Sequence, residues 1–171
     1  MERPQRLVRT TDYLRTMSGP FLLAGLVGCL PSFLWSDRYA LTTRVAFAGA
    51  FFGASFLFSG WWWARCFSKR LAKPLDRLPA GFGLPPGEPG SYLPPRRMIG
   101  YLVLCTLFIG WRGTRDGMPG GMLLAGAACG VVAVSRWVAR VERERGGRLV
   151  FLLVPGPAHT GTRLWIVREP V

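Results

Sequence analysis

Histidine is almost absent from this chain, since His159 is the only one among 171 residues. A single histidine is too few for a haem held by two histidines, and too few for an iron or zinc site that combines histidines with carboxylates. We also expect no serine activated by a histidine, because Ser32, Ser55, Ser59 and Ser135 of the apolar stretches have no histidine near them in the sequence. We therefore expect no catalytic residues, no cofactor and no metal, and expect His159 to be an exposed turn residue.

Cysteine is scarce and scattered. Cys29, Cys105 and Cys129 lie within apolar stretches, and Cys66 follows directly after another. No two of them are close in sequence, so the chain has no CxxC pair and no zinc-ligand spacing. We expect them to be small packing residues of helices.

Charge is missing from four long stretches, although the chain carries 22 Lys and Arg and 9 Asp and Glu for a net charge of +13. The charge-free stretches are Thr16–Ser36, Val45–Ala64, Met98–Trp111 and Gly117–Ser135. A 20-residue stretch such as the second is about 30 Å long as a helix, which matches the hydrocarbon thickness of a bilayer. Ionisable groups inside spans would indicate a proton or ion path, and these spans have none.

This pattern predicts an all-α membrane protein with about four transmembrane helices, arranged as two antiparallel hairpins. The third stretch is the exception, because its 14 residues give only about 21 Å of helix. It crosses the bilayer fully if Arg96, Arg97 and Arg112 extend it by snorkelling, and otherwise forms a partial or re-entrant span. We divide the chain into a basic N-terminal segment (1–15), a first hairpin (16–64), a basic Pro/Gly-rich connector (65–97), a second hairpin (98–135) and a basic tail (136–171).

The tail has its own pattern. The last span should continue as a basic helix until Gly146 and Gly147 end it, and Asp116 is a candidate N-cap at its other end. Beyond the glycines, two apolar runs flank a Pro/Gly turn, which predicts a β-hairpin of Leu149–Val154 with Arg163–Val167.

Three consecutive tryptophans end the second stretch, and basic residues follow at once. Tryptophan favours the boundary between hydrocarbon and head groups, and Lys or Arg just beyond it can reach lipid phosphate. We predict an interfacial, lipid-head-group role for Trp61, Trp62, Trp63, Arg65, Lys69, Arg70 and Lys73.

Small residues recur at a spacing of four within two of the stretches. Gly49 and Gly53 lie in the second stretch, and Gly126 and Gly130 in the fourth, each pair among alanines. Such faces let helix backbones approach closely in lipid. We predict that these glycines pack helices, either within this chain or against other membrane subunits.

An even number of spans places both termini and the connector on one side of the membrane. Only four of the 22 Lys and Arg lie in the two short turns, so the positive-inside rule favours the cytoplasmic or matrix side for the termini. The expected partners are other membrane-protein subunits and anionic phospholipids, with no nucleic acid, because lipid head groups are the nearer anions.

The sequence favours a non-catalytic accessory subunit of a multi-subunit membrane complex. A respiratory-chain or ATP-synthase assembly is the favoured host, and the mitochondrial inner membrane is favoured over a bacterial plasma membrane. The alternatives are a small carrier, channel or protein-translocation or assembly factor, which needs polar residues along a path, and a lipid-modifying enzyme, which needs a catalytic cluster.

Overall fold

A computed structural model describes residues 6–71, 76–77, 96–153 and 164–167 of the chain. Lys73 and His159 lie outside the described residues. The described part is mostly helical, with four helices and a small sheet. The helices are α1 (Thr10–Leu34), α2 (Leu41–Leu71), α3 (Arg96–Asp116) and α4 (Gly121–Glu144), and the strands are β1 (Arg6–Arg9), β2 (Asp76–Arg77), β3 (Arg148–Leu153) and β4 (Leu164–Val167).

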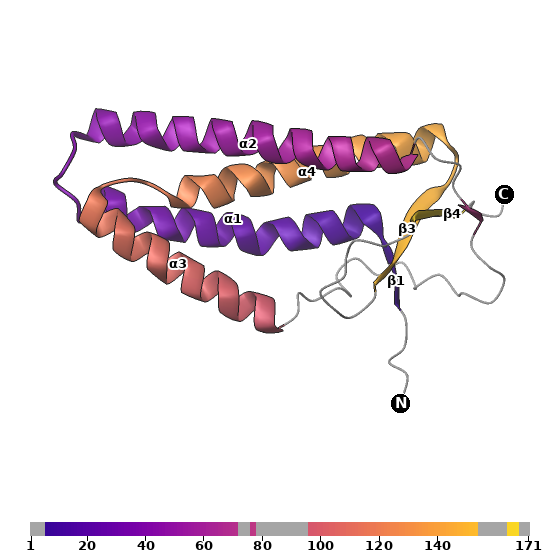
Figure 1. Cartoon of the computed structure of the whole chain (residues 1–171), viewed down its shortest axis with the longest axis horizontal. Coiled ribbons are helices and arrows are strands. Elements are labelled where there is room, and N and C mark those ends of the chain that lie inside the picture. Colours follow the sequence, from indigo (N-terminus) through magenta and orange to yellow (C-terminus); the bar gives the residue numbers. More distant parts are fainter. Residues whose placement is uncertain (1–5, 72–75, 78–95, 154–163, 168–171) are drawn as a thin grey trace.

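The helices lie side by side in an order that differs from their order in the sequence. Figure 1 shows α2, α4, α1 and α3 in succession, and the packing contacts join α2 to α4, α4 to α1, and α1 to α3. Consecutive helices run antiparallel, but α1 barely touches α2, and α3 barely touches α4. The two predicted hairpins are therefore interleaved, with α4 lying between α2 and α1.

Each helix extends beyond its charge-free stretch where the chain leaves the apolar region. Helix α1 begins at Thr10, so Pro20 lies well inside it rather than in its first turn. Helix α2 continues to Leu71, so the first residues of the predicted connector belong to the same helix as the tryptophans. Helix α4 continues to Glu144, as predicted from the glycine pair that follows it.

A four-stranded sheet lies at one end of the helices, which we call the sheet end. The predicted pairing of β3 with β4 is confirmed, with Leu149 opposite Ile166 and Val150 opposite Trp165. Strand β1 adds to the other edge of β3, and β2 pairs in parallel with β4, giving the order β1-β3-β4-β2. The first and last described segments of the chain are thus joined in one sheet.

The opposite end, which we call the turn end, carries the two short helix connections. Arg44 of α2 donates to the carbonyl oxygens of Ser32 (2.8 Å) and Phe33 (3.2 Å), which have no partner within the end of α1. Asp116 was predicted to cap α4, and this is wrong. It is the last residue of α3 and pairs with Arg112 at 2.7 Å, while Gly120 precedes α4 without a side-chain cap.

The largest cluster of buried apolar side chains lies at the sheet end rather than among the middles of the helices. It consists of Leu14, Phe67, Leu71, Val134, Val138 and Leu149, from the ends of α1, α2 and α4 and from β3. Large side chains elsewhere on the helices are mostly outside, including Leu23, Leu57 and Leu107. Outward leucines are at home in lipid, whereas burial of apolar groups is favoured where water is present.

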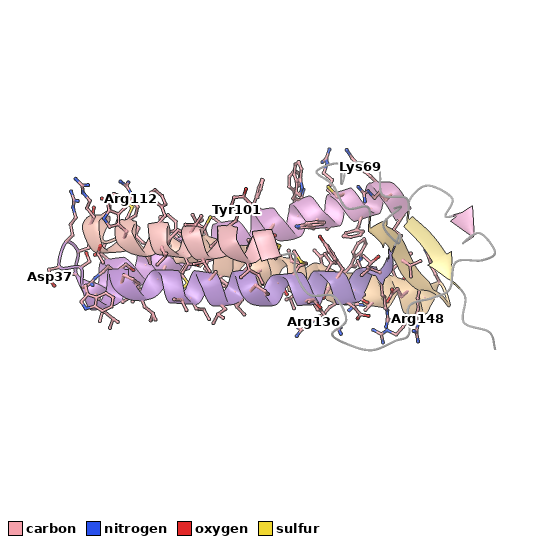
Figure 2. All side chains as sticks on the ribbon, turned by 90° about the horizontal axis from the view of Figure 1, so that it is seen from below. Asp37, Lys69, Tyr101, Arg112, Arg136 and Arg148 are labelled. Atoms are coloured by element: carbon pink, nitrogen blue, oxygen red, sulfur yellow. The ribbon has the colours of Figure 1, made fainter. Side chains whose placement is uncertain are left out.

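Three of the helices, α1, α2 and α4, are long and apolar enough to cross a membrane. Helix α3 is not among them, although its 21 residues extend over about 31 Å. Charged side chains gather at the two ends, since Figure 2 shows Asp37 and Arg112 at the turn end and Lys69, Arg136 and Arg148 toward the sheet end. This distribution is compatible with an integral membrane protein.

Candidate functional site

Helix α4 contacts α1 at backbone distance through small residues. A Cβ atom placed on Gly25 would lie 2.5 Å from the backbone nitrogen of Ala125, and one on Gly121 would collide with the Gly25 carbonyl oxygen. Ala125 and Ala128 are buried beside this contact. Small residues on both helices are therefore required for the observed approach.

The opposite face of α4 contacts α2 just as closely. A Cβ on Gly126 would collide with the Phe52 carbonyl oxygen, and one on Gly130 would lie 2.8 Å from that of Phe56. The predicted glycine pair of α4 thus lies at a helix contact within this chain. Because α4 meets α1 and α2 at backbone distance, no water-filled passage can run through either contact.

Two serines add polar contacts to this pair of helices. Ser55 of α2 donates to the carbonyl oxygen of Leu123, and Ser59, one turn further on, donates to that of Ala127 at 3.0 Å. A hydroxyl in an apolar environment needs such an acceptor, and carbonyls four residues apart on α4 match the spacing on α2. The two bonds fix the register of α2 against α4.

Gly49 and Gly53, the predicted pair of α2, are in a different environment. A Cβ on either would meet nothing within 4 Å. Ala46, Gly49 and Ala50 are exposed, and 6% of the most apolar window of α2 is buried within the chain, compared with 39% for α4. We call the surface formed by Ala46, Gly49, Ala50, Gly53 and Ala54 the open face of α2.

The three tryptophans divide between two environments. Trp63 packs against the apolar cluster at the sheet end and stacks on Phe67, with ring centroids 5.9 Å apart. Trp61 and Trp62 are exposed, at 54% and 52% of their surface. Consecutive side chains on a helix diverge by about 100°, so the triplet cannot face one way.

The basic residues follow the same helix toward the sheet end. The Arg65 guanidinium lies over the Trp61 ring, 5.4 Å from its centroid. Lys69 and Arg70 are exposed near the last turn of α2, where positive charge also complements the helix dipole. Their contact with lipid head groups remains a prediction, and Lys73 lies outside the described residues.

A buried carboxylate ties the sheet to α4. Glu142 is 4% exposed and accepts a hydrogen bond from Arg9 of β1 at 3.0 Å and from the backbone N–H of Leu149 in β3 at 2.9 Å. One side chain of α4 therefore holds two strands that lie far apart in the sequence. Within the described residues, no three His, Cys, Asp or Glu side chains are grouped so as to hold a metal.

Sequence reasoning missed several of these residues. Gly25 has no glycine four residues away, and the glycine four residues before Gly121, Gly117, lies outside α4, so the spacing of four within one helix does not identify this contact. Glu142 stands in the basic run "RWVARVERER", where an acidic residue is usually a solvent-exposed partner of its neighbours. Its burial becomes visible only when β1 and β3 are brought against α4.

The described helices leave the open face of α2 uncovered, and the exposed tryptophans and basic residues follow it along the same helix. Comparison with known proteins gives no further guide, since no family model, no curated protein and no solved structure matches this chain.

Proposed function

We propose that this protein is a non-catalytic structural subunit of a multi-subunit membrane complex, and that it docks through the open face of α2 onto a helix of another subunit. The observation that carries the proposal is the pair Gly49 and Gly53, small residues with open space beside them on a long apolar helix.

The reasoning compares the two faces of α2. Where α2 meets α4, glycines allow backbone contact and serines supply hydrogen bonds. The open face offers the same kind of small-residue surface, but none of the described helices lies on it. Lipid does not require small residues, since leucine or phenylalanine is equally stable there, whereas close helix association does require them.

We further propose an energy-transducing membrane as the setting, with a respiratory-chain or ATP-synthase complex of the mitochondrial inner membrane as host and both termini on the matrix side. The basic excess of the chain supports this orientation through the positive-inside rule. Such complexes contain many small basic subunits without active sites. A channel or carrier is the alternative, and the close contacts of α4 with α1 and α2 disfavour a path between those helices.

The test uses two variants with the same residue change in different environments. Gly49→Leu combined with Gly53→Leu adds bulk only to the open face, so we expect the protein to fold but to leave its complex. Gly126→Leu adds bulk at the contact of α4 with α2, so we expect a folding defect. Gentle detergent extraction, native gel electrophoresis and mass spectrometry would identify what travels with each variant.

The fold of each variant must be measured separately, by its resistance to thermal unfolding in detergent. The proposal fails if the Gly49→Leu, Gly53→Leu protein folds normally and is recovered with the same partners as the wild type. It also fails if the wild-type protein migrates alone after gentle extraction.

A further inference from the structure

A pocket of about 280 Å³ lies at the sheet end, between the last turns of α4 and strands β1 and β3. Its lining consists of Arg9, Ala139, Glu142, Arg143, Gly146, Gly147 and Arg148. The lining contains three arginines, from three different elements, and one carboxylate, which gives it a formal charge of +2. An arrangement of this kind attracts anions.

The single carboxylate is already engaged by the protein. Both Glu142 oxygens accept hydrogen bonds, one from Arg9 and the other from the backbone N–H of Leu149. Glu142 therefore joins α4 to β1 and β3 at the pocket, and its negative charge neutralises that of Arg9. The other two positive charges of the lining belong to Arg143, which is exposed on the last turn of α4 and donates through Nε to the Ala139 carbonyl oxygen at 3.4 Å, and to Arg148 at the start of β3.

The glycine pair gives the pocket its opening. Gly146 has φ +60°, and a Cβ placed on it would meet nothing within 4 Å. The backbone N–H groups of Gly146 and Gly147 bond to the carbonyls of Arg143 and Glu142, as in a Schellman motif. These bonds pair two helix-end carbonyls. The last turn of α4 is still the negative end of the helix dipole, so the arginines of the lining must outweigh it for an anion to bind.

The position of the pocket along α4 indicates which anion is nearby. The charge-free part of this helix ends at Ser135, and the lining residues from Ala139 to Arg143 follow within two turns. At 1.5 Å per residue, they lie about 6 to 12 Å beyond the apolar stretch, at the depth of lipid head groups if α4 spans the bilayer.

We propose that this pocket binds a phosphate group, as a phosphate monoester or diester, through Arg143 and Arg148. The planar guanidinium presents paired N–H donors that match two phosphate oxygens, and two such groups that line one pocket can bind the same phosphate. The proposal does not depend on docking through α2.

The test measures the thermal unfolding midpoint of the purified full-length protein in an uncharged detergent. Three probes are added in separate titrations at constant ionic strength: short-chain phosphatidylglycerol, inorganic phosphate and short-chain diacylglycerol, which lacks phosphate. A ligand that binds the folded state raises the midpoint in a concentration-dependent way. We expect no concentration-dependent rise with diacylglycerol.

The variant Arg143→Gln with Arg148→Gln should bind the phosphate-bearing probe at least about tenfold more weakly, since charge-assisted hydrogen bonds are lost. The matched control is Arg136→Gln with Arg140→Gln, which removes the same charge from exposed positions of α4 outside the lining. We expect the control to bind as the wild type does.

The probes also identify the source of the phosphate. A shift with phosphatidylglycerol alone assigns the site to a lipid head group, and a shift with inorganic phosphate alone assigns it to a soluble phosphate. A shift with both means that the phosphate group itself is sufficient. Absence of any shift, equal binding by the Arg143→Gln, Arg148→Gln protein, or an equal loss in the control overturns the proposal.

Discussion

The absence of a side chain at a few positions of α4 decides which helices this protein brings together. Gly121 faces α1, and Gly126 and Gly130 face α2, so one helix presents two small-residue faces to two neighbours. Glycine costs helix stability relative to alanine. Its presence in α4 is explained by the backbone contacts that a methyl group would prevent.

The change Gly126→Ala adds one methyl group and tests whether the contact between α4 and α2 requires glycine at this position. The added Cβ would collide with the Phe52 carbonyl oxygen and lie 3.0 Å from its carbon, so α2 must move away from α4. We expect a loss of about 1–3 kcal/mol in the free energy of unfolding, the usual cost of overpacking. Titration with a denaturing detergent, followed by circular dichroism, measures it.

Gly49→Ala is the control for helix propensity, because its Cβ meets open space. This change should leave stability the same or raise it by up to about 1 kcal/mol, since alanine favours helix more than glycine does. Equal effects of the two substitutions would mean that the contact between α4 and α2 does not depend on Gly126.

At the scale of whole elements, the small sheet depends on α4 for its position. Strand β1 has four residues and β2 has two, which is too short for stability without a surface to pack on. Leu149 and Val150 of β3 are buried, and Glu142 bonds to both β1 and β3. We therefore expect β1 and β3 to become less stable than the helices when the Glu142 carboxylate is removed.

Glu142→Gln removes the charge but keeps the shape of the side chain. We expect a loss of about 1 kcal/mol, because the Arg9 side chain is 36% exposed and solvent already screens part of the ion pair. Hydrogen exchange of the backbone amides of β1 and β3 should become faster, while exchange in the centre of α4 stays unchanged. The control is Glu144→Gln, a change at an exposed position of the same helix, which should have no effect on exchange. If amide exchange in β1 and β3 became faster in the Glu144→Gln protein as well, the hydrogen bonds of Glu142 would not be what holds the strands.

The sequence predicted where the helices lie better than it predicted how they pack. Charge-free stretches locate the four helices, because charge is costly in the hydrocarbon region. The charge pattern does not predict which helices pack on one another, since the apolar stretches have no charged face and lipid gives no preference among their faces. The β3–β4 hairpin follows from two β-branched runs and a turn, whereas β1 and β2 are too short to show any period.

For the molecule as a whole, the path of the chain assigns a role to α3. Helix α2 ends at the sheet end, and α4 begins at the turn end (Figure 1). Helix α3 packs on α1 along the part of this path that lies toward the turn end (Figure 1). We therefore expect α3 to cross the membrane, even though Arg112 and Arg115 make it the least apolar of the four helices.

Single cysteines in a background without the four native ones test this topology. Thr114→Cys at the end of α3 and Lys69→Cys at the end of α2 are both exposed positions. A thiol reagent that cannot cross membranes should label them from opposite sides, and Asp37→Cys should behave as Thr114→Cys does. Labelling of Thr114→Cys and Lys69→Cys from the same side would show that α3 does not cross.

The position of α4 between α1 and α2 has a consequence for biosynthesis. The ribosome delivers α1 and α2 first, yet these two helices have almost no surface in common. Helix α4, which contacts both of them, is synthesised more than 45 residues after α2 ends. The interval between the synthesis of β1 and that of its partner strand β3 is even longer. Helix α1 gains α3 as a neighbour first, whereas α2 must remain exposed to lipid, or to insertion factors, until α4 has been translated. A nascent chain halted after α3 lacks α4, the helix on which α2 packs. We expect membrane quality control to recognise the unpacked α2 of such a chain.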